Sequence, residues 1–521
     1  MGGSIQKYFL YAKMMEQKKK RKSFPTAFTV LFIILILSAI LTYIIPSGRF
    51  SRLIYDSQTN EFVVTDYEDK SITEPATQEV LDKLNIQLEL SKFKDGVIKK
   101  PLAIPGTYTR IAQHPQGISE ILEAPIQGIM DTVDIMIFVL ILGGIIGLVN
   151  KVGAFEAGMA ALSKKTKGKE FLLVSIIFFL TTLGGTTFGL AEETIAFYPI
   201  LMPIFLISGF DAITCIAAIY LGSCIGTMFS TVNPFSVVIA SNAAGISFTA
   251  GLTFRIVALS IAFLITLGYM YWYAKKVTND PTKSLTYDNK EQIHNRFLGD
   301  YDKEEENNEV VFTIRKKLIL TIFSLAFLIM IWGVSSAGWW FEEMSALFLG
   351  VSIIIIFLSG LSEKEAVSTF ISGAADLVGV VLTIGLARSI NIILDQGHIS
   401  DTLLDYSINL VSGMSGWLFA VTQMVVFSFL GFFIPSSSGL AVLTMPIMAP
   451  LADSVGLSRE IVINAYNWGQ GLMAFITPTG LILVTLEMAE TTFDRWLKYV
   501  LPLMAIIGLY AVVMLIISTL L

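Results

Sequence analysis

The chain has 521 residues, of which 54% are hydrophobic and 15% are charged, whereas a soluble domain is usually about a quarter charged. This composition excludes an ordinary water-soluble protein and indicates a chain that lies in a lipid bilayer. The formal net charge of −6 is spread over loops without a basic stripe, which argues against nucleic acid as a partner.

The first long apolar run, residues 27–45, has about the length that crosses a bilayer and follows the basic cluster at residues 18–22. We expect a retained helix rather than a cleaved signal, because the apolar core is long and residues 46–50 form a poor cleavage site. The polar stretch that follows has short alternating runs, such as residues 61–64, which predict strands in a small extracytoplasmic domain.

Residues 118–130 carry apolar side chains at helical spacing before a span that starts at Val133. This pattern fits either an interfacial helix or the start of a longer tilted helix. Next, two apolar runs of roughly thirteen residues, 171–183 and 195–207, are too short to span comfortably. They flank the sequence GGTTFG at residues 184–189, and this arrangement predicts a re-entrant hairpin.

A longer apolar stretch then contains Pro234, which has no amide hydrogen and whose ring crowds the carbonyl of Ser230. We therefore expect a discontinuous helix. After a crossing at residues 253–273 comes a polar loop, and its Glu/Asn-rich middle at residues 304–308 is expected to be mobile. The second half repeats the pattern, with interruptions at residues 435–439 and 477–480.

The two halves align with each other. The motif PILMP at residues 199–203 matches PIMAP at residues 446–450, and 446 − 199 gives an offset of about 247 residues. A slightly smaller offset of about 245 places Asp131 on Asp376. Each half therefore contains a span, a hairpin, a broken helix and a second span.

Basic residues near the spans fall on one side if the hairpins re-enter, and that side is cytoplasmic by the positive-inside rule. The two repeats are then inverted, the N-terminus is cytoplasmic and the C-terminus is extracytoplasmic. We predict an all-α polytopic membrane protein with about nine spans and two re-entrant helical hairpins. The predicted organisation is a cytoplasmic tail (1–25), a first transmembrane helix (26–46), an extracytoplasmic polar domain (47–125), a first repeat (126–275), a cytoplasmic loop (276–313), scaffold helices (314–360) and a second repeat (361–521).

Several motifs resemble the anaerobic four-carbon-dicarboxylate carrier family, and more closely its branch of basic amino-acid antiporters of the arginine/ornithine type within the ion-transporter superfamily. They are IPSGRF at residues 45–50, IPGTY at 104–108, GLAEE at 189–193 and the tip PSSSG at 435–439. The resemblance implies dimers of a scaffold and a mobile transport domain, with elevator-type alternating access. Superfamily members often carry Ser-Asn-Thr at both tips. The tips here have no Asn, which puts a simple transfer of the sodium sites in doubt.

Hydroxyl groups gather at the tips and breaks, where neutral oxygens beside freed carbonyls suit a dehydrated cation or the polar ends of a solute. The alternative is that they only satisfy helix ends or allow close packing. Predicted substrate-binding hydroxyls are Thr186, Thr187, Ser436, Ser437, Ser438, Thr477 and Thr479. Predicted ion-coupling residues are Ser230, Thr231, Thr186, Ser437 and Thr477, with a sodium ion or a proton as the coupling ion and no other cofactor or metal.

Glu192 and Glu193 follow the first tip, where a carboxylate would pair with an ammonium or guanidinium group or carry a proton. Adjacent helical residues point about 100° apart, so we expect only one of them to face a site. Asn233 and Asn467 are predicted to orient the solute, although hydrogen bonding between helices explains them nearly as well.

Arg388 is a clear cation within a second-half span and could hold a carboxylate. Pairing with Asp395 or Asp376, or an outward orientation, is the favoured interpretation. Asp131 and Asp376 themselves are interpreted as helix-start residues at the interface.

The sequence thus predicts a secondary transporter in the cytoplasmic (inner) membrane that carries a basic amino acid by exchange. A C4-dicarboxylate carrier coupled to sodium or protons is the alternative. The expected partners are a small-molecule substrate, the lipid bilayer and a second copy in a homodimer. We do not expect an enzyme, since the three histidines all fall in predicted loops. Nor do we expect an ATP-driven pump, because the sequence contains no phosphate-binding loop motif. A channel is a further alternative.

Overall fold

The computed structural model describes residues 26–521 except residues 87, 95–100, 156, 159–168, 188, 299–311, 338, 412 and 415. The predicted tail at residues 1–25 and the predicted mobile segment at residues 304–308 therefore lie outside the described residues.

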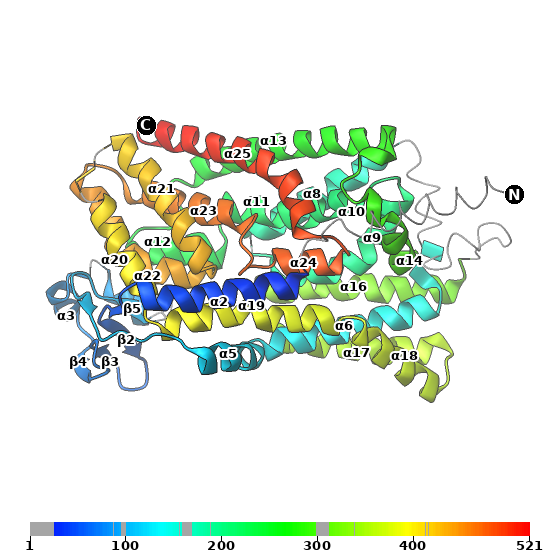
Figure 1. Cartoon of the computed structure of the whole chain (residues 1–521), viewed down its shortest axis with the longest axis horizontal. Helices are drawn as coiled ribbons and strands as arrows, with labels where there is room; N and C mark the ends of the chain where they lie inside the picture. The colour runs from blue at the N-terminus through cyan, green and yellow to red at the C-terminus, as the bar shows by residue number, and fades with distance from the viewer. Residues whose placement is uncertain are drawn as a thin grey trace, which may run out of the picture.

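The helices run mostly along the long axis of an elongated bundle, with the strands gathered at one end (Figure 1). Within the described part of the chain, eight helices are long and apolar enough to cross a membrane. They are α2 (Ala27–Ile44), α6 (Val133–Lys151), α8 (Glu170–Thr187), α13 (Leu252–Asn279), α17 (Phe341–Ser359), the joined helices α18 and α19 (Glu363–Gln396), α21 (Gly416–Phe433) and α25 (Phe493–Ser518). A further helix of 23 residues, α16 (Ile314–Ser336), precedes α17.

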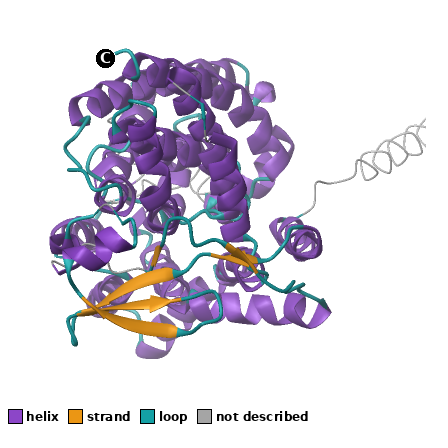
Figure 2. Ribbon diagram, turned by 90° about the vertical axis from the view of Figure 1, so that its left-hand side faces the viewer, coloured by secondary structure: helices purple, strands orange, loops and turns teal. Residues whose placement is uncertain are grey.

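The strands form a small domain after α2, as predicted, and Figure 2 looks onto the end of the molecule that carries it. A four-stranded sheet has the order β4-β3-β2-β5, and β1 pairs with β6. Phe62 alternates inward on β3 and packs on Phe93, with ring centroids 5.2 Å apart. The strands and short helices are β1 (Gly48–Arg49), β2 (Arg52–Asp56), β3 (Glu61–Thr65), β4 (Ser71–Pro75), α3 (Gln78–Lys83), α4 (Leu90–Lys94), β5 (Leu102–Ala103) and β6 (Thr109–Arg110).

Helix α5 (Ile118–Asp131) lies along α19 (Val378–Gln396) and leads through Thr132 directly into α6. The apolar side chains of Ile118, Leu122 and Ile126 are exposed, so the segment is not a buried start of a longer helix, and the interfacial helix stays a prediction. In the same way α18 (Glu363–Ala375) leads into α19 and lies along α6. A Cβ atom on Gly128 would lie 2.2 Å from the carbonyl oxygen of Gly385, so only glycine permits this helix crossing.

The first interrupted segment differs from the prediction. Helix α8 continues through Thr187, so the limb has 18 residues instead of about thirteen, and the interruption begins only after it. Close packing explains Gly185, which was taken for part of a break: a Cβ atom on it would lie 2.4 Å from the carbonyl oxygen of Ser223 on the neighbouring helix α11 (Gly222–Met228). The chain then continues in the 3-10 helix η1 (Glu192–Phe197) and α9 (Tyr198–Ile207).

The predicted breaks in the two long helices are present. The first helix consists of α10 (Ala212–Ile216), η2 (Ala217–Leu221) and α11 (Gly222–Met228), and a new helical segment starts only at Pro234 with η3 (Pro234–Val238) and α12 (Ile239–Ala243). In the second half, α22 (Ser437–Ser454) leads into α23 (Arg459–Ala474), which stops before α24 (Ile482–Met488). Both stops leave backbone carbonyls without helical partners.

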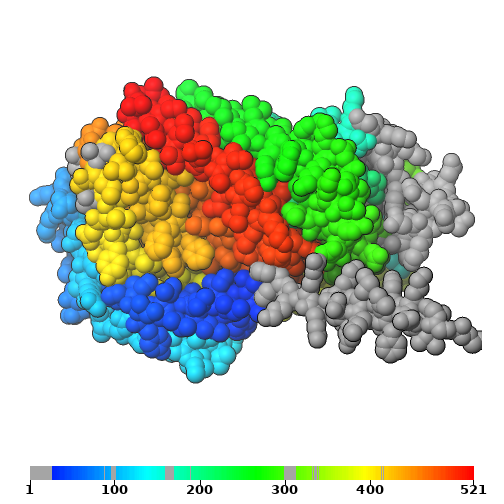
Figure 3. All heavy atoms as spheres, turned by 45° about the horizontal axis from the view of Figure 1, so that its top comes forward, coloured from blue at the N-terminus to red at the C-terminus, as the bar shows by residue number. Residues whose placement is uncertain are grey.

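The last helices of the two halves, α13 and α25, lie side by side on one face (Figure 3). The Tyr510 hydroxyl of α25 donates to the carbonyl oxygen of Ala258, and the Tyr269 hydroxyl of α13 donates to the carbonyl oxygen of Tyr499.

Short helices complete the connections. They are η4 (Pro281–Lys283), η5 (Tyr287–Asn289), α14 (Lys290–Phe297) and α20 (Ser400–Val411). The prediction that all three histidines lie in loops is wrong for His294, which lies in α14. His114 and His398 do lie in loops, and their rings meet edge to face with centroids 5.1 Å apart.

Candidate functional site

The first helix break is joined to the end of α8 by buried hydroxyl and amide groups. The Thr186 hydroxyl oxygen lies 3.0 Å from that of Thr231 and accepts a 2.9 Å hydrogen bond from the Thr231 backbone N–H. Asn233 donates through Nδ2 to the carbonyl oxygen of Gly185 at 2.9 Å. The same Asn233 side chain accepts from the N–H of Phe235 and so caps the segment that begins at Pro234.

The second break has a similar arrangement with different residues. The hydroxyls of Thr477 and Thr479 lie 2.9 Å apart and both approach the carbonyl oxygen of Phe432, near the end of α21, at 3.5 and 3.2 Å. Gln470 donates through Nε2 to the carbonyl oxygen of Pro435 at 3.0 Å. In each half, polar groups of the broken helix therefore satisfy the end of the preceding limb.

The two breaks lie close to a shared helix contact. Helix α11 packs against α23, and a Cβ atom on Gly471 would lie 2.5 Å from Cβ of Met228, the last residue of α11. The Tyr220 hydroxyl donates at 2.6 Å to the carbonyl oxygen of Ala474, the last residue of α23. The fold thus brings together two breaks that are more than two hundred residues apart in the sequence.

Not every predicted residue takes part in these joints. Thr187 donates its hydroxyl to the carbonyl oxygen of Leu183 in its own helix. Ser436 accepts from the N–H of Gly439 and caps α22, whose first residues are Ser437 and Ser438. Ser230 is fully buried and accepts from the backbone N–H of Asn233 at 3.3 Å. The tip of the second half is therefore largely engaged in starting α22.

Asn467 remains a strong candidate for solute contact. Its amide nitrogen is buried in α23 and has no hydrogen-bond partner within the described part of the chain. The same is true of the amide oxygen of Asn464, one turn earlier, and of the hydroxyl of Ser236 beside the first break. Buried polar groups are rarely left without partners, so these atoms are suited to a solute or water. Sequence reasoning missed Ser236, although its position two residues after Pro234 was a usable signal.

The two glutamates after the first tip differ in burial and in hydrogen bonding. Glu193 is only 7% exposed, and its carboxylate accepts a 3.0 Å hydrogen bond from the N–H of Ala191 at the start of η1. Glu192 is half-buried on the same short helix, which packs against α6 and α24. Glu193 therefore stabilises its own turn, whereas Glu192 is the better candidate to face a solute.

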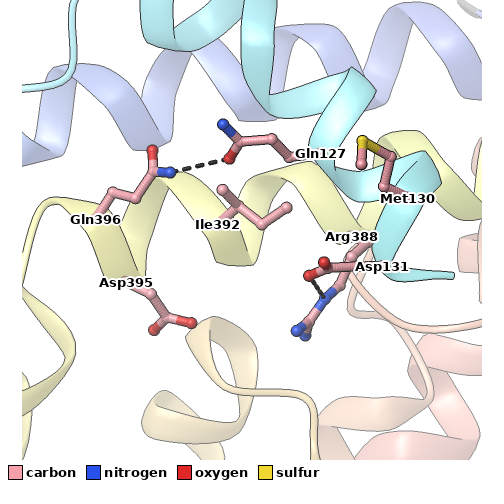
Figure 4. A pocket seen from close by; sticks show the side chains of 7 residues that line it. All are labelled: Gln127, Met130, Asp131, Arg388, Ile392, Asp395 and Gln396. Atoms are coloured by element: carbon pink, nitrogen blue, oxygen red, sulfur yellow. Dashed lines mark hydrogen bonds and ion pairs between the residues drawn. The ribbon is translucent and has the colours of Figure 1, made fainter.

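Sequence reasoning missed a cavity between α5 and α19. Its volume is about 380 Å³, and it is lined by Gln127, Met130, Asp131, Arg388, Ile392, Asp395 and Gln396 (Figure 4). Of the favoured alternatives for Arg388, pairing with Asp395 or Asp376 is not observed: its Nε lies 3.3 Å from a carboxylate oxygen of Asp131, and its side chain is 42% exposed. Asp131 is the last residue of α5 rather than a helix-start residue, and Asp376 is the C-cap of α18.

The apolar spans and the interrupted helices with buried polar joints define an integral membrane protein of the transporter class. The sequence matches the C4-dicarboxylate anaerobic carrier family (DcuC) over residues 24–520, and the chain belongs to this family.

Two relatives cover almost the whole chain. A Haemophilus influenzae protein described as "Uncharacterized protein" is 54% identical over 502 residues, which are 96% of this chain and 98% of the relative. The "Putative basic amino acid antiporter YfcC" of Escherichia coli K12 is 29% identical over 499 residues, covering 92% of this chain and 93% of that protein.

Among the solved structures that resemble this chain, two share 15% sequence identity with it. Neisseria gonorrhoeae MtrF, described as illuminating a class of antimetabolite efflux pumps, matches with a TM-score of 0.38 over 96% of each chain. The Alcanivorax borkumensis YdaH transporter matches with a TM-score of 0.39 over 95% of this chain and 98% of that one.

Proposed function

We propose that the protein is a secondary transporter that exchanges basic amino acids across the cytoplasmic membrane by an elevator-type movement. The observation that carries this proposal is the pair of helix breaks, each joined by buried hydroxyls to the preceding limb and both close to the contact of α11 with α23. Paired discontinuous helices near the middle of a bundle are where secondary transporters bind solute and coupling ion.

The packing supports inverted repeats. Helices α5 and α19 lie together, as do α6 and α18, so exchanging the two halves maps one pair onto the other. In Figure 1, α21 and α22 lie toward the end with the strands, whereas α9 and α14 lie toward the opposite end. We therefore place the two hairpins on opposite sides of the membrane, with the strand domain outside and α14 in the cytoplasm. The elevator would move the hairpins and broken helices against α5, α6, α18 and α19, in a homodimer.

The charge of the solute is inferred from the break region. Glu192 and Glu193 supply carboxylates beside the first tip, and the residues that join the two breaks are neutral. Arg255 is buried, but its guanidinium donates to the carbonyl oxygens of Ala250 and Phe248. A cationic or zwitterionic amino acid suits such a region better than a dicarboxylate, which would need two cationic or amide clamps. The E. coli relative carries a name of the same class.

The second candidate is a C4-dicarboxylate carrier coupled to sodium or protons, favoured by the family description. Proteoliposomes loaded with L-arginine, L-ornithine or succinate separate the two, with and without a sodium or proton gradient. We expect counterflow of labelled L-arginine against internal L-arginine or L-ornithine. Uptake of succinate alone would replace the first proposal by the second. Rates equal to those of empty liposomes for every solute would refute both.

A further inference from the structure

The cavity between α5 and α19 lies near the end of the molecule that carries the strand domain. Helix α19 ends at Gln396, and two residues later the carbonyl oxygen of His398 accepts from the N–H of Gly48 on β1. Two polar contacts hold the cavity wall together: Arg388 to Asp131 at 3.3 Å, and Gln396 Nε2 to Gln127 Oε1 at 2.9 Å. A volume of about 380 Å³ is at the lower end of the range for small-molecule pockets, about 300–1,000 Å³.

The guanidinium of Arg388 is only partly used. Its Nε bonds to Asp131, whereas Nη1 and Nη2 have no hydrogen-bond partner among the described residues, and the side chain is 42% exposed. Figure 4 shows these two nitrogens pointing away from Asp131. Two parallel N–H donors of an arginine match the two oxygens of a carboxylate.

Asp395 lies on the same side of α19, seven residues after Arg388. Seven residues are two helical turns, which place the two Cα atoms about 10 Å apart along one face. Figure 4 shows the Asp395 carboxylate pointing to the same side of the helix as the guanidinium. A ligand with a carboxylate at one end and a cation at the other can therefore contact both residues.

The charge of the cavity selects among such ligands. Two aspartates and one arginine give its lining a formal charge of −1. An α-amino acid with a cationic side chain carries a net charge of about +1 and balances this lining. A dicarboxylate would add two negative charges to a site that already has one in excess, and the repulsion disfavours it.

A related cavity lies between α6, α9, α14 and the junction of α18 with α19. It has a volume of about 410 Å³, and its lining includes Gly143 and Asn150 of α6 and Asp376 of α18. With an offset of 245 residues, 376 − 131, these three positions match Arg388, Asp395 and Asp131. The repeat position of Arg388 is thus a glycine, and here the lining arginine is Arg296, supplied by α14. The combination of arginine and aspartate is present in both cavities although the arginines come from unrelated segments.

From these observations we infer that the cavity formed by Asp131, Arg388 and Asp395 is an extracytoplasmic capture site for a basic α-amino acid. The ligand's carboxylate binds Nη1 and Nη2 of Arg388, and its side-chain cation binds Asp395. This inference rests on the proposed function for the class of ligand, but the site is separate from the helix breaks and receives the solute before they do.

A local probe tests the site without relying on transport. Cys215 and Cys224 are buried, so a Gln127→Cys variant of the full chain places an accessible thiol at the rim of the cavity. The rate of its modification by a membrane-impermeant maleimide is measured in right-side-out membrane vesicles. We expect L-arginine to slow the modification, and agmatine, which has the same cation but no carboxylate, to require about tenfold higher concentration, as for loss of a charged hydrogen bond.

Variants of the two charged residues complete the test. In the Gln127→Cys background, Arg388→Gln should abolish the difference between L-arginine and agmatine, and Asp395→Asn should weaken protection by both about tenfold. Arg388→Lys keeps the charge and the fold but lacks the planar fork, so it should also lose most of the difference. Lys364→Gln on α18, outside the cavity lining, is the matched control and should leave protection unchanged.

The outcomes separate this inference from the proposed function. Protection that is equal for L-arginine and agmatine, or that survives Arg388→Gln unchanged, overturns the capture site even when proteoliposomes exchange L-arginine. If protection depends on the carboxylate but the protein exchanges no amino acid, the capture site is supported and only the proposed function is refuted.

Discussion

At the scale of single residues, Thr186 joins the end of α8 to the unwound chain of the first break. Its hydroxyl accepts from the N–H of Thr231 and shares a hydrogen bond with the Thr231 hydroxyl, while its carbonyl oxygen accepts from the N–H of Val232. One residue thus satisfies three groups of the unwound chain, in a region where unpaired polar groups are costly.

Thr186→Val keeps the shape of the side chain and removes its hydroxyl. We expect a stability loss of about 1–3 kcal/mol, because the buried N–H of Thr231 loses its acceptor, and at least tenfold slower exchange in proteoliposomes. Thermal unfolding of the purified protein measures the first effect. Ser175→Ala is the control, since that hydroxyl on the same helix donates only to the carbonyl oxygen of Phe171. Equal exchange rates in the two variants would contradict a role for Thr186.

The glutamates allow a second prediction. Glu192→Gln should abolish exchange of cationic amino acids, because it removes the proposed solute contact, and should leave the unfolding temperature nearly unchanged, because the side chain is only half-buried. Glu193→Gln should instead lower the unfolding temperature, because it weakens the bond to the N–H of Ala191. The reverse result, with Glu193→Gln inactive and stable, would reassign the solute contact to Glu193.

His398 predicts a dependence of stability on pH. Burial, together with the positive charge of Arg49, lowers the pKa of its imidazole below the usual value of about 6.5. The folded state therefore binds a proton less readily than the unfolded state, and stability that is fully present above pH 6.5 is lost as the pH falls below it. His398→Asn suits the positive φ of 51° and should flatten the fall of the unfolding temperature between pH 7.5 and 5.5. Identical slopes for the two proteins would contradict this assignment.

The sequence predicted some of these residues well and others poorly. Pro234 has a chemistry that breaks helices anywhere, so the first break could be placed without a structure. The partner of Arg388 could not be predicted in this way, because Asp131 lies 257 residues away in the sequence and nearer aspartates looked equally suitable. Long-range pairing depends on the crossing of α5 with α19, which composition and spacing do not reveal.

At the scale of helices, glycines decide how closely the elements approach. The sequence GGTT in α8 suggested a loop because glycine and hydroxyl residues are typical of turns. In the fold these residues face α11 instead, where a Cβ atom on Gly226 would lie 2.1 Å from the carbonyl oxygen of Thr182. Membrane helices commonly use small residues in this way, so the helix continues where the sequence predicted an end.

Gly226→Ala tests this packing. We expect overpacking to lower the free energy of unfolding by about 1–3 kcal/mol. We also expect slower exchange, because the added methyl group forces α8 and α11 apart beside the first break. Gly268→Ala in α13 is the matched control, since nothing lies within 4 Å of the position of its Cβ atom. Heat inactivation of the purified variants measures the difference, and equal inactivation temperatures would show that α8 and α11 are free to separate.

At the scale of the whole molecule, helix α18 (Glu363–Ala375) shows what the sequence could not predict. The sequence did not predict α18 as a helix, because its run of charged residues near residue 363 resembles a loop. Helix α18 is stabilised by its contact with α6, which only the assembled fold provides.

Membrane orientation can be measured with single cysteines. A cysteine at Thr59, in the hairpin between β2 and β3, should react with an impermeant maleimide in intact cells. A cysteine at Lys283, in η4, should react only after permeabilisation. Cys215 and Cys224 are buried and should contribute little background. Labelling of the Lys283→Cys protein in intact cells would reverse the proposed orientation.

The strand domain is attached to parts of the bundle that an elevator would separate. Val442 of α22 is buried in the core of the domain with Phe62 and Phe93, while the N–H of Gly48 on β1 donates to the carbonyl oxygen of His398, two residues after the end of α19. Inward movement of α22 would withdraw Val442 from this core, and exposing such a side chain costs about 1.5–3 kcal/mol. The domain would then favour the resting conformation roughly ten- to hundredfold, so that part of the transport cycle's energy barrier would lie outside the membrane.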